Sequence, residues 1–257
     1  MRKKLFLIFI GIWLVTYFTQ DRYRWVTDIS PEVLTAPIQT KVADGKPILF
    51  TKDGFSYTLT PLFDYDISGL VVHRMIYNRW FSLSRTDSVF FMDICMIWGE
   101  NVKRGTYRNG DVDFLQDARF CRYSYGEGHE IFNNALSNNH LVIRDDDKER
   151  LVEAIQAGDQ VRIRGKLVNV EAKALANPER YEPTDLLWPT STTRDDTGAG
   201  ACETIFVESV EILRRGNPSS RVLHSVSFYG IIILFVWALG ELTFEVYRGE
   251  LLIQKRS

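Results

Sequence analysis

Residues 191–203 (STTRDDTGAGACE) crowd hydroxyl, cationic and anionic side chains together with two glycines, directly before a predicted strand. Gly198 and Gly200 would let successive backbone N–H groups surround an anion. However, the segment has no lysine followed by serine or threonine and no strand–loop–helix context, both of which a phosphate-binding loop needs. A polar hairpin held by an ion pair between Arg194 and an aspartate explains the same residues. If the chain has a ligand-binding site we expect it here, with Arg194, Asp195 and Asp196 as candidates.

A second cationic group alternates along a predicted strand. In residues 158–172 (GDQVRIRGKLVNVEA) the cations Arg162, Arg164 and Lys166 fall on one face and the apolar residues on the other. These three side chains could bind an anionic polymer or lipid headgroups, and they are further candidate ligand-binding residues. A strand face exposed to water explains the same alternation.

The same segment carries a resemblance to a known fold. Its Gly-Asp turn, its alternating valine and isoleucine, and Gly165 as a bending point resemble the strand of OB-fold-type barrels that has the pattern GD-x-V-x-V-x-G. A short predicted helix precedes it, which suits the comparison. The resemblance implies a β-barrel and assigns no activity, because many functions share such folds.

Other polar residues have structural explanations. Asp64 and Asp66 share one strand face, as paired catalytic carboxylates do, but a solvated strand face is the ordinary explanation and the one we favour. Asp93 lies inside the apolar run 88–99, so an arginine or a set of backbone donors should meet it. Residues 127–130 include Glu127 and His129, yet no second histidine or cysteine lies at ligand spacing. We therefore expect no metal and no cofactor.

The three cysteines are too few for a disulfide scaffold. Cys95, Cys121 and Cys202 allow one bridge and one remaining thiol in an oxidising compartment, and the sequence does not choose the pair. Cys202 as a nucleophile would need a histidine beside it. Nothing in the spacing of the four histidines places one there.

Two apolar segments flank the region that contains the candidate site residues. Residues 222–240 (VLHSVSFYGIIILFVWALG) would span roughly 29 Å as a helix, close to the ~30 Å thickness of a bilayer's hydrocarbon core. Residues 5–18 follow the basic start MRKK, as in a cleavable signal peptide, but no small-x-small cleavage site follows them, which favours an uncleaved anchor over that alternative. We predict transmembrane helices at 5–20 and 222–240. The basic residues at both ends of the chain favour cytoplasmic termini.

The region between these segments has the pattern of a β-rich domain. Residues 48–61 predict a hairpin turning at Asp53-Gly54, residues 88–99 a buried central strand, 145–158 a short helix, and 203–215 the last strand. The expected fold class is mainly β (α+β): a single β-barrel or sandwich domain with one short helix, of which an OB-like barrel is one form, flanked by two transmembrane helices.

The predicted organisation follows from these elements. It consists of a cytoplasmic basic N-terminus (1–4), transmembrane helix 1 (5–20), a juxtamembrane connector (21–40), an extracytoplasmic β-rich domain (41–215), a linker (216–221), transmembrane helix 2 (222–240) and a cytoplasmic tail (241–257). This build is similar to that of bacterial two-span proteins of the inner cell membrane, and that similarity assigns no functional residue.

Composition narrows the function. A net charge of −2 excludes a generally basic protein that coats nucleic acid, so no nucleic-acid partner is expected. We expect a membrane-anchored binding or scaffolding module of an envelope assembly, whose partners are the lipid bilayer and a membrane or envelope protein. One alternative is an envelope enzyme that uses the 191–203 loop. Another is a subunit of an oligomeric channel or transporter with a ring of Glu241.

Overall fold

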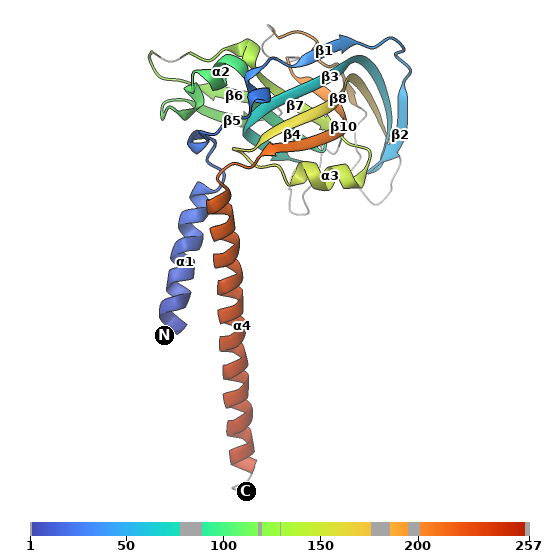
Figure 1. The fold of residues 1–257 in the computed structure, drawn as a ribbon. Helices are drawn as coiled ribbons and strands as arrows, with labels where there is room; N and C mark the ends of the chain where they lie inside the picture. Colours follow the sequence, from blue (N-terminus) through green and yellow to red (C-terminus); the bar gives the residue numbers. More distant parts are fainter. Residues whose placement is uncertain are drawn as a thin grey trace. The chain divides into compact units, whose positions relative to one another are not determined.

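The computed structural model describes residues 2–77, 89–117, 120–128, 130–175, 186–194 and 201–254 (Figure 1). The chain divides into two compact units. One consists of residues 1–22 together with 217–257, and the other of residues 23–216. Asp195, Asp196 and His129 from the sequence predictions lie outside the described residues.

The helical unit contains α1 (Arg2–Thr19) and α4 (Pro218–Gln254). Among the described residues, one helix is long and apolar enough to cross a membrane: Pro218–Arg248 of α4, whose most apolar 18-residue stretch has a mean hydropathy of 2.1. The prediction of two spanning helices is therefore corrected to one. The physical reason lies in α1, whose 18 residues include Arg2, Lys3 and Lys4, so that no apolar window of spanning length remains.

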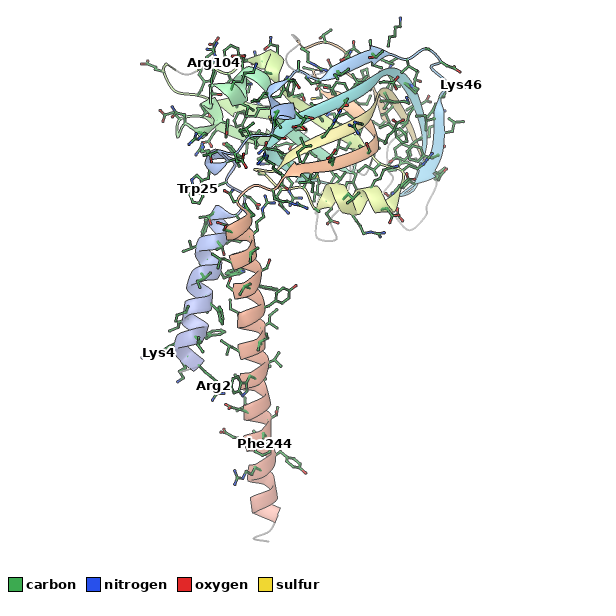
Figure 2. All side chains as sticks on the ribbon, in the orientation of Figure 1. Arg2, Lys4, Trp25, Lys46, Arg104 and Phe244 are labelled. Atoms are coloured by element: carbon green, nitrogen blue, oxygen red, sulfur yellow. A yellow bond between two sulfur atoms is a disulfide. The ribbon has the colours of Figure 1, made fainter. Side chains whose placement is uncertain are left out.

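Helix α1 packs against α4 at several positions. The Thr16 hydroxyl lies 3.1 Å from His224 Nδ1. A Cβ added at Gly230 would lie 2.8 Å from the ring of Phe9, so the glycine permits the close approach of the two helices. Arg2 forms an ion pair with Glu241 (Figure 2). Glu241 thus has Arg2 as an ion-pair partner.

The second unit is a mixed α+β domain built on an eight-stranded sheet. The strands of this sheet are β1 (Ile38–Lys41), β2 (Ile48–Lys52), β3 (Phe55–Ile76), β4 (Met92–Ile97), β7 (Leu136–Val142), β8 (Gln160–Ala174), β9 (Leu186–Trp188) and β10 (Glu203–Arg214). A separate hairpin contains β5 (Asp113–Asp117) and β6 (Phe120–Ser124). The helices are α2 (Gly99–Lys103) and α3 (Asp146–Glu153), with short 3₁₀ turns at Tyr23–Trp25, Pro31–Leu34, Thr106–Arg108 and Asn133–Ala135.

Five strands pair in a ring. β3 pairs with β4, β4 with β7, β7 with β10, β10 with β8, and β8 with β3; only the β7–β10 pair among these is parallel. β1 and β2 add to the edge of β3, and β9 adds to the edge of β8. The eight-stranded sheet as a whole is therefore not a closed barrel, because these three strands extend it beyond the ring. Figure 1 shows the long, curved strand β3, which pairs with β8 from Phe55 to Leu70.

Local sequence explains several of these elements. Asp53 and Gly54 have φ values of 50° and 86°, so the β2–β3 hairpin turns where the sequence predicted. The predicted helix after residue 145 is α3, which ends at Glu153, several residues before Gly158. Val152 and Ile155 are fully buried, whereas Leu151 is 52% exposed.

The main core lies inside the ring of strands, and an inserted region covers part of its outside. Met92, Ile94 and Met96 point inward from β4, where apolar side chains of β8 and β10 meet them. On the opposite face of β4, Cys95 packs in a second cluster with residues of the β5–β6 region. A disulfide between Cys95 and Cys121 joins β4 to β6, and Cys202 is a buried thiol outside this bridge.

Candidate functional site

The three cations of the strand β8 face are paired with aspartates of β3. Arg162 donates to both carboxylate oxygens of Asp66, at 2.8 and 2.5 Å, and Arg164 donates to Asp66 at 3.1 Å. Lys166 reaches Asp64 at 2.5 Å. Asp66 is the register partner of Arg164 and Asp64 that of Lys166, so these are cross-strand ion pairs. Two carboxylates therefore pair with three cations on one strand face.

This pairing gives a pH-dependent contribution to stability. The hydrogen bonds from Arg162 are the largest cause that holds the pKa of Asp66 below its ordinary value of 3.8. A depressed carboxyl pKa stabilises the folded state above the unfolded pKa, and the contribution is lost as the pH falls through the folded pKa. We expect Asp66→Asn to lower the free energy of unfolding by about 1 kcal/mol at pH 7. The difference from wild type should shrink as the pH falls below 3.8, the ordinary pKa of an aspartate, in urea unfolding of the full chain. A difference that does not change with falling pH would contradict the pairing.

Arg194 lies in a corner formed by four other side chains. Its guanidinium forms an ion pair with Glu203 and donates to Gln39 Oε1 at 3.1 Å. The guanidinium carbon is 5.0 Å from the centre of the Tyr65 ring and 6.0 Å from that of Trp98. Glu203 is thus the ion-pair partner of Arg194 among the described residues, whereas the aspartates that the sequence pointed to, Asp195 and Asp196, lie outside them.

Burial gives this corner its electrostatic character. The Glu203 side chain is 3% exposed, while that of Arg194 is 21% exposed. Burial raises the pKa of the Tyr65 hydroxyl well above its ordinary value of 10.0, and the Glu203 carboxylate adds to the rise. A buried carboxylate is costly unless a cation or hydrogen-bond donors meet it. Arg194 therefore compensates the negative charge of Glu203, which is too buried for water to solvate it.

Asn139 brings a further acceptor to the same sheet face, because it is the register partner of Glu203. Its amide nitrogen donates to the Ile94 carbonyl and to the Ser137 hydroxyl. Its Oδ1 atom is buried and has no hydrogen-bond partner among the described residues. The corner therefore offers more hydrogen-bond acceptors than Arg194 uses.

A second buried polar cluster lies on the other face of these strands. His140 Nδ1 lies 2.7 Å from Asp93 Oδ1, and the Tyr77 hydroxyl donates to the other carboxylate oxygen at 2.5 Å. The imidazole is stacked on Phe90 and meets the edge of Trp188. The sequence predicted an arginine or backbone donors for Asp93, and the structure supplies a histidine and a tyrosine. His140 and Asp93 are both fully buried.

A chain of polar contacts leads from a second histidine toward Cys202. His73 Nδ1 lies 3.4 Å from Gln116 Oε1, Gln116 donates to Asn138 Oδ1 at 2.9 Å, and Asn138 lies 3.7 Å from the Cys202 sulfur. Two amide side chains therefore separate this imidazole from the thiol. A nucleophile and its base must be within direct hydrogen-bonding distance of each other. This series of contacts is therefore not the arrangement of a cysteine nucleophile that His73 activates.

Sequence reasoning selected Arg194 but missed the residues around it. Glu203 lies on the same strand face as the buried Ile205 and Val207, because side chains two residues apart in a strand point the same way. A carboxylate at such an inward position could have been noticed in the sequence. Gln39, Tyr65 and Trp98 come from distant segments and carry no such signal.

Among the described residues, no group of three or more His, Cys, Asp or Glu is arranged to hold a metal ion. Neither a scan of protein-family models nor a search of curated proteins finds a match for this chain.

Proposed function

We propose that the protein is a membrane-anchored binding or scaffolding module of an envelope assembly, with the 23–216 domain on the extracytoplasmic side. Helix α4 is the observation that carries this proposal. Its segment Pro218–Arg248 has 31 residues, and the most apolar 18-residue stretch within it has a mean hydropathy of 2.1 and almost no buried surface within the structure. A helix of that length and composition would be insoluble on its own and is suited to lipid.

The disulfide supports the extracytoplasmic side. Cys95 and Cys121 are paired within the domain, and structural disulfides persist mainly in oxidising compartments. Cys95 is fully buried within the sheet, so the disulfide links the β5–β6 hairpin to the core. In the cytoplasm the same two thiols would be kept reduced.

The order of strand pairing supports an OB-like core. β3, β4 and β7 are joined in antiparallel order, α3 precedes β8, and β10 pairs with both β7 and β8. The OB fold is a five-stranded, partly open Greek-key barrel that commonly binds other molecules. This architecture suits a binding module and does not by itself name a ligand.

The geometry of Glu241 weighs against the channel alternative. A pore lined by Glu241 needs free carboxylates in an oligomer, but Glu241 is paired with Arg2 of the same chain. The enzyme alternative gains no specific support either, because Arg194 is engaged with Glu203 and Asn138 lies between Gln116 and Cys202. The binding module remains the function that the contacts favour.

Thiol labelling of intact cells tests the proposed placement. Single cysteines are introduced at the exposed Thr51 of the domain or at Ser257 of the tail, in a Cys202→Ala background. A membrane-impermeant maleimide should label Thr51→Cys in intact cells and Ser257→Cys only after permeabilisation. The reverse result would refute the proposed side.

Extracted in mild detergent, an assembly component should migrate well above the 29.7 kDa monomer, and migration as a monomer would contradict a scaffolding role.

The disulfide should contribute measurably to domain stability. Cys95 and Cys121 are 26 residues apart in sequence. Closing a loop of that size restricts the unfolded chain, so Cys121→Ser should lower the free energy of unfolding by about 3 kcal/mol in urea titrations. Reductant should destabilise the wild type by a similar amount and leave Cys121→Ser unchanged. A wild type insensitive to reductant would show that the bridge contributes nothing.

A further inference from the structure

The corner around Arg194 has the parts of a site that recognises a guanidinium group. A buried carboxylate from Glu203 faces the cation, Gln39 Oε1 accepts from a second nitrogen, and the Tyr65 and Trp98 rings lie within 6.0 Å of the guanidinium carbon. A carboxylate matches the fork of a guanidinium, and aromatic faces attract cations. The guanidinium of Arg194 shows that a group of this size and charge fits.

The receiving groups and Arg194 differ in how firmly the fold holds them. Glu203 belongs to β10 and Tyr65 to β3, and the rings of Tyr65 and Trp98 are 2% and 1% exposed. Arg194, by contrast, belongs to no helix or strand, and its side chain is the more exposed partner of the ion pair, at 21% against 3% for Glu203. The acceptors are therefore preorganised by the sheet, while the cation reaches them from the solvent side.

The corner also has an acceptor to spare. Asn139 Oδ1 is buried without a hydrogen-bond partner among the described residues, next to Glu203 across the β7–β10 pair. Leaving a buried acceptor unpaired is unfavourable, so each such atom calls for an explanation. A bound hydrogen-bond donor near Glu203 would give Asn139 Oδ1 a partner and so explain it.

Resting on the proposed binding function, we propose that this corner binds the guanidinium of an arginine side chain presented by a partner polypeptide, and that Arg194 occupies the corner as an internal competitor. The partner segment is therefore basic. Its arginine replaces Arg194 on Glu203, between the same aromatic rings. A lysine binds less well, because an ammonium group lacks the planar fork that engages the carboxylate and Gln39 together.

Competition by Arg194 makes the affinity of the free protein low. When an internal group fills a site most of the time, the apparent dissociation constant rises by the inverse of the fraction left open. Removing the Arg194 cation should therefore tighten binding of an external guanidinium by about tenfold or more. Without Glu203 the corner should not bind it at all.

The test uses the full chain in detergent micelles and blocked arginine (Nα-acetyl-arginine methylamide) as the probe. Blocked citrulline, which has the same shape without the charge, is the ligand control. Arg194→Gln is the test variant, and Arg164→Gln is the matched control because it also removes one arginine paired with a carboxylate. Blocked arginine should raise the Tm of Arg194→Gln by at least about 3 °C at saturation, and calorimetry should show binding about tenfold tighter than to the wild type.

Each result decides the proposal. No thermal shift for Arg194→Gln, equal shifts for Arg164→Gln, or equal shifts with blocked citrulline would overturn it, as would undiminished binding to Glu203→Gln. If Arg194→Gln does not fold, Arg194→Lys keeps the charge, and blocked arginine should then bind it more tightly than it binds the wild type. Failure of this test leaves the labelling result for the proposed function intact, and a reversed labelling result leaves the binding measurement intact.

Discussion

Replacing His140 by alanine is expected to lower the free energy of unfolding by about 3–5 kcal/mol, because it leaves a buried carboxylate without its main partner and a cavity between two aromatic rings. The imidazole lies 2.7 Å from Asp93, and both side chains are 0% exposed. It is stacked on Phe90 at a centroid distance of 4.9 Å and meets Trp188 at 5.1 Å. Only the Tyr77 hydroxyl bond to Asp93 would be retained among the contacts described for this carboxylate.

Urea unfolding of the full chain measures this effect, with His140→Asn as the matched control. The amide nitrogen of asparagine stands close to the position of Nδ1, so it can donate to Asp93 and should recover part of the loss. A His140→Ala variant within about 1 kcal/mol of wild type, as expected for a surface substitution, would show that the cluster does not hold the strands together.

Replacing Gly165 by alanine should destabilise the domain by about 3 kcal/mol or prevent folding, because no side chain fits there. A Cβ at this position would lie 2.0 Å from the carbonyl oxygen of Phe206, a backbone atom of β10. Gly165 pairs with Val207 on one side and Tyr65 on the other, so the clash lies within the ring of strands. Neither strand can move away without breaking its other pairings.

Gly110→Ala is the control for this substitution. A Cβ added at Gly110 meets nothing within 4 Å, and its φ is not positive. Alanine there should change the free energy of unfolding by less than about 1 kcal/mol. Equal effects of the two substitutions in thermal unfolding would contradict the close β8–β10 packing.

Local patterns in the sequence were sufficient for several elements of the fold. Asp53-Gly54 predicts a hairpin because only residues that tolerate positive φ suit its turn, and the turn is observed. The alternation of Phe55, Tyr57 and Leu59 predicts a buried strand face, and all three side chains are buried. The sequence overcounted the membrane helices, because the apolar run after MRKK is short and begins beside three cations.

The partners of polar residues could not be predicted from local patterns. Asp93 and His140 are 47 residues apart, and their contact depends on the register of β4 and β7. The choice of Cys95 and Cys121 for the disulfide likewise depends on where the β5–β6 hairpin packs. Register between distant strands is set by the packing of the whole sheet rather than by neighbouring residues. For the same reason Arg194 was selected as a candidate without Glu203.

Alkaline carbonate extraction of membranes that contain the full chain tests most directly whether α4 anchors the protein in lipid. Carbonate strips proteins held at the surface and leaves those that cross the bilayer. The full chain should stay in the membrane pellet, and a variant with lysine at Ile232 and Phe235, in the apolar centre of α4, should be recovered in the supernatant to a much greater extent. Release of the unaltered chain by carbonate would contradict the membrane-anchored module.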